Sequence, residues 1–470
     1  MISYAQLVRY PGNQALFEAI EMCVLSTLCG RPLHLHAEGL RGTGKTTIMR
    51  AARHLLPPIL RVRGCPYNCH PSRPHCPLHR GMKREELAAL GTEWVPMPFL
   101  EISHSAKMGT VVGSIDLSRL TARDKPDAAL LPGTIPQAHR GVIFIDEINR
   151  LAETSPELTD VLLGVMGTKP GRIQIEETGL PVACIEVNAG VWAASNPDED
   201  PGPLEDIRRQ LADRFDLVVS MGRPAASEAV RAVLEASDAY FVQQLAGSRG
   251  GEAGTDLPVG ATLAVGAAVP ALEGNREHWQ PLLQTVPHVT VPDTLRSLVA
   301  SLYVDFGLES LRAVEAWQLA ARMHAALAGR KETDASDFVA VAPMVLRHRV
   351  EMSTLSEVMA RLDQPGSTTG PTSENQEGAQ VPAGASAQQG EGGLANLFAR
   401  ARERLHSLMN GERAGDGSEG GRGSRQGTRG GRGAGGSAPV TDPMRLPLVA
   451  PPALARPLPE LPAATWVREE

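Results

Sequence analysis

Short apolar runs alternate with amphipathic stretches along the first half of the chain. Six runs have the length and composition of buried strands: 32–38, 59–63, 99–103, 141–146, 190–195 and 216–221. The stretches between them carry apolar residues three and four positions apart, which is the spacing of one helix face. This alternation predicts a parallel sheet whose strands are connected by crossover helices.

The apolar spacing becomes helical throughout from about residue 224 to residue 350. The stretch LESLRAVEAWQLAARMHAALA is typical, and one Gly-rich segment, AGSRGGEAGTD, interrupts the pattern. We therefore expect an α/β domain over residues 1–223, followed by a helical domain over residues 224–362.

Residues 363–470 differ from both, because glycine, proline and small polar residues replace the large apolar ones. A segment of this composition cannot bury enough surface to offset its ordering entropy, so we expect a disordered Gly/Pro/Arg-rich tail. One amphipathic helix is predicted near residues 394–409. The tail is either a flexible appendage or a partner-docking segment, and the four arginines of its glycine–arginine part (422, 425, 429 and 432) could also contact RNA.

The charge balance excludes some classes of protein. The chain has 46 Lys and Arg against 53 Asp and Glu, a net charge of −7, so it has no general positive field for nucleic acid or an anionic membrane. No signal-peptide pattern and no run of roughly 18 apolar residues occurs. We expect a cytoplasmic protein, whose six cysteines are reduced thiols or metal ligands rather than disulfides.

The clearest chemical motif is GLRGTGKTT at residues 39–47, which follows a predicted strand and precedes a predicted helix. In that context the pattern predicts a P-loop, in which backbone N–H groups and the helix N-terminus hold phosphates. Lys45 would reach the β- and γ-phosphates of ATP, and the Thr46 hydroxyl would ligate Mg²⁺. The predicted nucleotide-binding residues are Gly39, Gly42, Thr43, Gly44, Lys45, Thr46 and Thr47.

Two carboxylates follow the apolar run VIFI about a hundred residues later. After a P-loop, this pair suits phosphoryl transfer, with Asp146 supporting Mg²⁺ and Glu147 accepting a proton from the attacking water. Asn196 ends another apolar run, where its amide could hold the water or contact the γ-phosphate, although Asn-Pro is also an ordinary turn. Arg214 either forms a surface ion pair or enters a neighbouring subunit's nucleotide site as an arginine finger.

In order and spacing, these motifs resemble those of the AAA+ ATPases, and more narrowly the I subunit of magnesium chelatase and its MoxR-like relatives. The resemblance covers roughly residues 5–350 and is carried by these stretches: GLRGTGKTTIMRAARHLLP, RGCPYNCHP, VVGSIDLSRL, PGTIPQAHRGVIFIDEINRL, ASNPDE, RRQLADRFDL and AALAGRKETDASDFVAVAPMVLRHR. It implies an α/β fold with an AAA+ parallel-sheet core, a C-terminal helical lid, and ATP hydrolysis with Mg²⁺ in an oligomeric ring, a hexamer in the family.

The resemblance also implies roles for single residues. Asn196 takes the place of the first sensor, and Arg214 that of the finger that acts on the adjacent subunit's ATP. Arg312 takes the place of the second sensor, although its context, GLESLRAVEAW, departs from the family's Gly-Leu-Arg-Gly-Asp. Residues 107–120 and 172–187 resemble an inserted segment and a hairpin that line the ring's pore or face and contact partners in the relatives.

Several functions follow as alternatives. A chelatase motor would act with a subunit that carries a von Willebrand factor A domain, and would drive magnesium insertion into protoporphyrin IX. A MoxR-like chaperone ATPase would serve a von Willebrand factor A partner outside pigment synthesis. An MCM-like nucleic-acid motor is disfavoured by the acidic charge and by the three acidic residues in the predicted hairpin. A nucleotide-binding scaffold with slow turnover is the remaining alternative.

The stretch GCPYNCHPSRPHCPLHR, residues 64–80, lies outside these phosphate motifs. Cys65, Cys69, Cys76 and His79 are zinc-compatible ligands, with His70 and His75 as alternates, and the surrounding prolines fit a closed structural site. Three interpretations stay open: structural Zn²⁺, reduced redox-sensitive thiols, or an inert loop.

Overall fold

The computed structural model describes residues 3–115, 130–175, 182–249 and 269–363. The predicted tail over 363–470, its helix near 394–409 and the end of the segment 107–120 lie outside these residues, apart from Asp363. Among the described residues, no helix is both long enough and apolar enough to cross a membrane.

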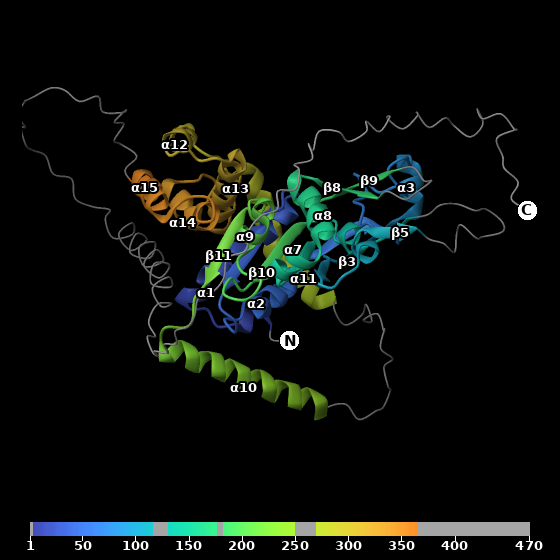
Figure 1. The fold of residues 1–470 in the computed structure, drawn as a ribbon. Coiled ribbons are helices and arrows are strands. Elements are labelled where there is room, and N and C mark those ends of the chain that lie inside the picture. Colours follow the sequence, from blue (N-terminus) through green and yellow to red (C-terminus); the bar gives the residue numbers. More distant parts are fainter. Residues whose placement is uncertain (1–2, 116–129, 176–181, 250–268, 364–470) are drawn as a thin grey trace, which may run out of the picture. The chain divides into compact units, whose positions relative to one another are not determined.

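A five-stranded parallel sheet forms the centre of the fold, in the order β11-β1-β10-β7-β4 (Figure 1). Its strands are β1 (Leu35–Gly39), β4 (Phe99–Ile102), β7 (Val142–Asp146), β10 (Gly190–Ser195) and β11 (Leu217–Met221). Five of the six predicted strands are confirmed here. They are readable from sequence because helices cover both sheet faces, so apolar residues run nearly without interruption.

The sixth predicted strand was placed wrongly. Strand β2 (Pro58–Val62) pairs antiparallel with β3 (Thr92–Pro96) in a separate two-stranded sheet. Only Ile59 and Val62 of β2 are buried, no residue of β3 is, and Arg61 forms an ion pair with Glu93 of β3 at 2.8 Å. A half-exposed ribbon of this kind carries a weaker apolar signal than a central strand, which explains why β3 was not predicted.

Two further antiparallel ribbons project from the α/β core. Strands β5 (Gly113–Ile115) and β6 (Leu130–Pro132) form one, and β8 (Gly171–Ile175) and β9 (Ala183–Val187) form the other. The second ribbon confirms the hairpin expected at 172–187, with its residues 176–181 outside the described part.

Helices surround the sheet and continue into the C-terminal part (Figure 1). Those before β11 are α1 (Pro11–Leu28), α2 (Lys45–Ala51), α3 (Arg84–Leu90), α4 (Met108–Val111), α6 (Thr134–Gln137), α7 (Ile148–Thr154), α8 (Pro156–Gly167) and α9 (Leu204–Ala212). Those after it are α10 (Ser227–Arg249), α11 (Val269–Thr285), α12 (Asp293–Asp305), α13 (Leu311–Leu327), α14 (Ala335–Leu346) and α15 (Met352–Asp363). Short 3-10 turns lie at Tyr4–Gln6, Ala52–Leu55 and Val286–His288.

One apolar cluster joins the sheet to the C-terminal helices. It contains Phe17 of α1, Trp192 of β10 and Trp317 of α13, all fully buried. The Trp317 indole also donates a hydrogen bond of 2.9 Å to the carbonyl of Phe338 in α14. Helix α1 therefore packs between the sheet and the C-terminal helices. On the side of the sheet that α1 covers, the sheet and these helices share one apolar core.

This shared core predicts a single cooperative unfolding transition for the sheet and the helices α12–α15. Trp317→Ala should cost about 3–5 kcal/mol of unfolding free energy, because it leaves a large cavity in that core. Urea titrations followed by far-UV circular dichroism and by tryptophan fluorescence should give coincident midpoints, both lowered in the variant. A second transition left unmoved by the substitution would contradict the prediction.

Candidate nucleotide-binding site

The P-loop connects the end of β1 to the start of α2. Gly39 has a φ of 145° and Gly44, the N-cap residue of α2, a φ of 88°, both in the region that favours glycine. A Cβ on Gly39 would also meet the carbonyl oxygen of Met221 at 2.7 Å. The positive φ angles of Gly39 and Gly44 allow the loop to make a tight turn, after which α2 begins at Lys45.

A cavity of about 330 Å³ opens above this loop. It is lined by residues 41–47, Asp146, Glu147, Ser195 and Asn196. The structure thus brings together every predicted nucleotide-binding residue except Gly39, which contributes through its carbonyl, together with the two carboxylates and Asn196. The parallel register explains this, because Ala37 lies opposite Ala194 and Ala194 opposite Asp146.

The Lys45 ammonium lies at the floor of the cavity. It donates hydrogen bonds to the carbonyls of Gly39 at 2.6 Å and Leu40 at 2.9 Å, and to the Asn196 side-chain oxygen at 2.7 Å. Burial lowers the pKa of Lys45, while Asp146 acts in the opposite direction. The cation is therefore fixed between the P-loop and the tip of β10, where phosphate oxygens would replace these acceptors.

Thr46 and Asp146 form one corner of the cavity. The Thr46 hydroxyl donates to the Asp146 carboxylate at 3.1 Å. Arg50 lies 3.5 Å from the same carboxylate and 3.0 Å from Glu101. A hydroxyl and a carboxylate facing one another beside a phosphate site are hard oxygen ligands of the kind that Mg²⁺ prefers.

Glu147 occupies the first position after β7 with a φ of 54°, a left-handed conformation that is costly for a residue with a side chain. Its carboxylate pairs with Arg150 at 3.2 Å. Arg150 in turn lies 4.0 Å from Glu199, which pairs with Arg41 of the P-loop at 2.8 Å. These three partners were not predicted from the sequence, because single charged residues carry no periodic signal, whether in a loop or, as for Arg150, in helix α7.

Two buried histidines lie on and just before strand β1: His36 is beside Ser195 of the cavity wall, and His34 is at the opposite, amino end of the sheet. His36 is 2.9 Å from the Ser195 hydroxyl, and His34 accepts a hydrogen bond from the backbone N–H of Val191 through Nδ1. Burial lowers the pKa of each to about 3, so both rings are neutral at physiological pH.

Arg214 does not reach this cavity. It lies between α9 and β11, and within the described residues its guanidinium has no hydrogen-bond or ion-pair partner. Arg312 is close enough to Arg214 that its charge, after burial, lowers the pKa of Arg214. Arg312 donates to the carbonyls of Met166 and Gly167 at 2.8 and 2.5 Å, at the end of α8. The two arginines thus lie together, away from the phosphate-binding loop of their own chain.

A second cavity, of about 530 Å³, lies next to Arg312. Its lining includes Arg31, Lys169, Asp216 and Arg322. It is larger than the first cavity, but it contains neither the glycine loop nor the Asp146–Glu147 pair. The chemistry of the walls therefore assigns the nucleotide to the smaller cavity.

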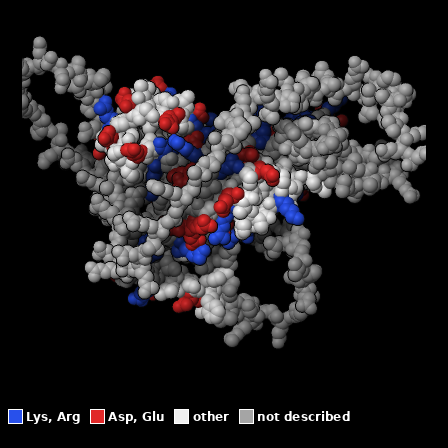
Figure 2. Space-filling model, in the orientation of Figure 1, with Lys and Arg blue, Asp and Glu red and all other residues white. Residues whose placement is uncertain are grey.

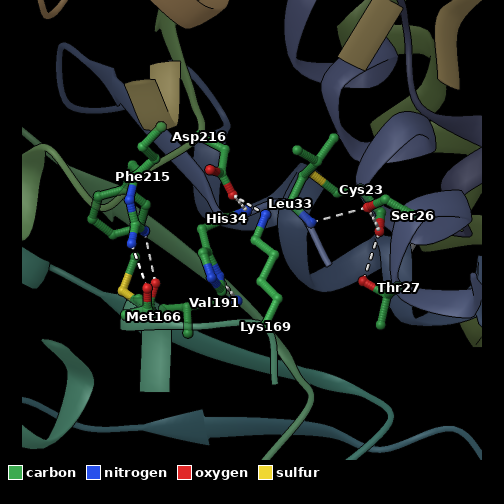
Figure 3. Close-up of polar contacts among 12 residues, drawn as sticks. Cys23, Ser26, Thr27, Leu33, His34, Met166, Lys169, Val191, Phe215 and Asp216 are labelled. Atoms are coloured by element: carbon green, nitrogen blue, oxygen red, sulfur yellow. Dashed lines mark hydrogen bonds and ion pairs between the residues drawn. The ribbon is translucent and has the colours of Figure 1, made fainter. Parts of the chain in front are cut away.

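The segment around Arg214 is fixed from the side of β8 (Figure 3). Asp216 is fully buried, accepts a hydrogen bond from the His34 backbone N–H at 2.9 Å and pairs with Lys169 at 3.0 Å. Burial alone would raise the pKa of Asp216, but Lys169 and His34 outweigh it and hold the pKa below its ordinary value. Because Lys169 lies two residues before β8, this pair ties the β8–β9 ribbon to the start of β11.

The C-terminal helices hold the same segment from the other side. Arg349, just beyond α14, pairs with the Asp213 carboxylate at 3.1 Å and donates to the carbonyls of Asp213 and Phe215, both at 2.8 Å. His348 contacts the Phe215 carbonyl at 3.2 Å. Both neighbours of Arg214 in the chain are therefore held, while its own guanidinium is left available.

Comparisons with known proteins identify the family of this chain. A model of the AAA lid domain matches residues 296–365, which include α13, α14 and α15. The magnesium-chelatase 38 kDa subunit of Acidiphilium rubrum is 33% identical over 328 residues, covering 69% of this chain and 85% of that protein. The chain belongs to the magnesium-chelatase 38 kDa subunit family of AAA+ ATPases. The subunit of Cereibacter sphaeroides is 31% identical over 324 residues, covering 68% of this chain and 85% of that protein.

Membership in this family confirms the predicted fold class, and makes the chain an ATPase of a family that uses ATP and Mg²⁺. Among solved structures, a complex between subunits BchI and BchD of magnesium chelatase is 24% identical with a TM-score of 0.37, covering 76% of this chain and 99% of that one.

Replacing Glu147 with Gln should lower ATP hydrolysis by about 10²–10⁴-fold, because it removes the proton acceptor while preserving the shape of the side chain. ATP affinity should stay close to that of the unchanged protein, since Lys45 and the P-loop are intact. Phosphate release and titration with a fluorescent ATP analogue measure the two quantities. Glu153→Gln, on the exposed face of the same helix α7, is the matched control. Equal hydrolysis by both variants would contradict the role of Glu147.

Proposed function

We propose that this chain is the ATP-hydrolysing ring subunit of a magnesium chelatase, coupling hydrolysis to the remodelling of a partner complex that inserts magnesium into protoporphyrin IX. Two observations support the proposal. The relatives that span most of the chain are magnesium-chelatase subunits. The cavity above the P-loop gathers the groups that phosphoryl transfer needs and leaves the candidate finger outside.

The proposed chemistry follows from the positions of the side chains. Lys45 and the backbone N–H groups of the P-loop hold the β- and γ-phosphates. Thr46 and Asp146 hold the Mg²⁺ that accompanies ATP, directly or through water. Glu147 orients the attacking water and takes its proton, while Asn196, now bonded to Lys45, contacts the γ-phosphate. Each group then acts by positioning and charge.

The position of Arg214 supports assembly of the chain into a ring. Its guanidinium lies outside the nucleotide cavity of its own chain. Arg349 holds its two neighbours in the chain, and Lys169 holds Asp216 two residues further on. A guanidinium in this position can contribute to a nucleotide site only on a second copy of the chain, where it would act as an arginine finger in trans. Arg312, beside it, would approach the same neighbouring nucleotide as the second sensor.

The β8–β9 ribbon is the proposed contact for the partner. One face of the ribbon is buried, and the other exposes polar residues that include the pair Arg172 and Glu186 at 3.9 Å. Acidic and basic side chains also intermingle on the face shown in Figure 2. Such a surface suits a protein partner, which we propose carries a von Willebrand factor A domain, better than the uniformly basic track that nucleic acid needs.

Mixing two inactive variants tests the ring. Glu147→Gln retains the finger, whereas Arg214→Ala retains the proton acceptor, and each alone should hydrolyse ATP at a small fraction of the normal rate. In a random 1:1 mixture, about a quarter of the subunit boundaries combine an intact Glu147 with an intact Arg214 from the neighbour, so that share of activity should return. Activity that stays at the level of the separate variants would show that Arg214 does not act in trans.

Magnesium insertion tests the partner assignment. The chain should support formation of magnesium protoporphyrin, read by its fluorescence, when combined with ATP and the two other chelatase subunits of its own organism. The Glu147→Gln variant should abolish insertion and Glu153→Gln should preserve it. Normal ATPase activity without insertion would favour a MoxR-like function instead, and strong stimulation by DNA would favour a nucleic-acid motor.

A further inference from the structure

The loop between β2 and α3 gathers four side chains that the ATPase chemistry does not use. One ligand atom from each of Cys65, Cys69, Cys76 and His79 lies within 4.8 Å of every other. The three thiols are fully buried, and His79 is 8% exposed. Cys76 and His79, which follow Cys65 by eleven and fourteen positions in the chain, therefore meet it at a single point inside the protein.

The spacing of these atoms matches that of a tetrahedral metal site. A zinc ion with Zn–S bonds of about 2.3 Å holds two sulfur ligands about 3.8 Å apart. The sulfur atoms of Cys65 and Cys76 are 4.0 Å apart, and the Cys76 sulfur is 3.2 Å from Nδ1 of His79. Three thiolates and an imidazole are soft and borderline ligands that select Zn²⁺ over Mg²⁺.

Backbone N–H groups point at the sulfurs as they do around bound thiolates. The Cys69 sulfur accepts hydrogen bonds from the N–H groups of His75 and Cys76 at 3.3 and 3.4 Å, and the Cys65 sulfur from that of Cys69 at 3.5 Å. The nearby guanidinium of Arg140 adds a positive charge that interacts with Cys69. Groups outside the ligand set that stabilise thiolate charge are a regular part of metal sites.

The other two histidines of the loop have different partners. His70 bonds to the Ser72 hydroxyl at 2.7 Å, on the exposed side of the loop. The His75 ring stacks on His139 at 3.7 Å between centroids, and its Nδ1 lies 3.2 Å from the Cys69 sulfur. Only His79 belongs to the group in which all four ligand atoms lie within 4.8 Å of one another, so His79 is the candidate fourth ligand and His75 packs against the cluster.

We propose that Cys65, Cys69, Cys76 and His79 bind one structural Zn²⁺. Binding releases three thiol protons, forms three Zn–S bonds and one Zn–N bond, and leaves the cluster with one net negative charge opposite Arg140. The four protein ligands fill the tetrahedron, so no position remains for a substrate or a reactive water. The site is therefore structural, and separate from the Mg²⁺ that accompanies ATP.

Such a site would brace the start of strand β7. The Asn68 side chain, inside the loop, donates to the Gln137 carbonyl at 2.6 Å, and Arg140 donates to the Leu60 carbonyl at 2.6 Å. His139 accepts a hydrogen bond from the Asn188 backbone N–H at 3.1 Å, between β9 and β10. The loop between β2 and α3 is thus connected, through His139, to the segment that joins β9 to β10.

Metal analysis of the full-length protein, purified without chelator, tests this inference. We expect about one zinc per chain by inductively coupled plasma mass spectrometry, and a loss of most of it in Cys76→Ser. Cys184→Ser, which changes an exposed thiol on β9, should retain the zinc. Protein that lacks zinc while alkylating freely at Cys65, Cys69 and Cys76, or that holds iron with visible absorbance, would overturn the proposal.

Two measurements on the unsubstituted protein cover the case in which Cys76→Ser fails to fold. A mercurial reagent should release zinc, detected by a chromogenic chelator, in proportion to the thiols it modifies. Replacement of zinc by Co²⁺ should give the intense visible bands of a tetrahedral thiolate site. A disulfide between Cys65 and Cys76 in freshly purified protein, or Co²⁺ spectra typical of six oxygen ligands, would contradict the assignment.

Discussion

The parallel register of three neighbouring strands is the constraint on which the nucleotide site depends. Strands β1, β10 and β7 end at the same edge of the sheet, and hydrogen bonds fix their relative offset. The P-loop and Asn196 follow the ends of β1 and β10, and Asp146 is the last residue of β7, so residues about a hundred and fifty positions apart meet at Lys45. A slip of one residue in β10 would turn the amide of Asn196 to the opposite face and leave the buried ammonium without that partner.

A second network links this edge to the rest of the chain. The residues on both sides of Arg214 are held by Arg349 beyond α14 and, through Asp216, by Lys169 at the base of the β8–β9 ribbon. Loss of Lys169 alone would destabilise the fold, because the buried Asp216 carboxylate would be left without its compensating charge. The contacts therefore make a continuous mechanical connection between the candidate finger, the lid helices and the proposed partner surface.

Much of the fold and of the phosphate site was readable from the sequence, for a physical reason. The strand VIFID is buried along its apolar residues and ends in two carboxylates, and the P-loop glycines adopt conformations that few other residues accept. What the sequence did not show is long-range pairing of single charges. Glu199 pairs with Arg41 and Arg349 with Asp213, each far away in the chain, and nothing in their local context marks them. The strand β2 was misplaced because an apolar run does not reveal which sheet it joins.

The apolar core shared by α1, the sheet and α13 limits how far the C-terminal helices can move relative to the sheet. In an ATPase whose lid is joined to its core by a thin linker, nucleotide binding can rotate one part against the other within a single chain. Here such a rotation would open buried apolar surface around Phe17 and Trp317, at a cost proportional to the area exposed. In the proposed ring, the chain itself would then be the stiffest unit, and the softest joint would lie between one copy and the next. In a ring built from such units, ATP hydrolysis would move neighbouring subunits relative to one another at the boundaries where Arg214 lies.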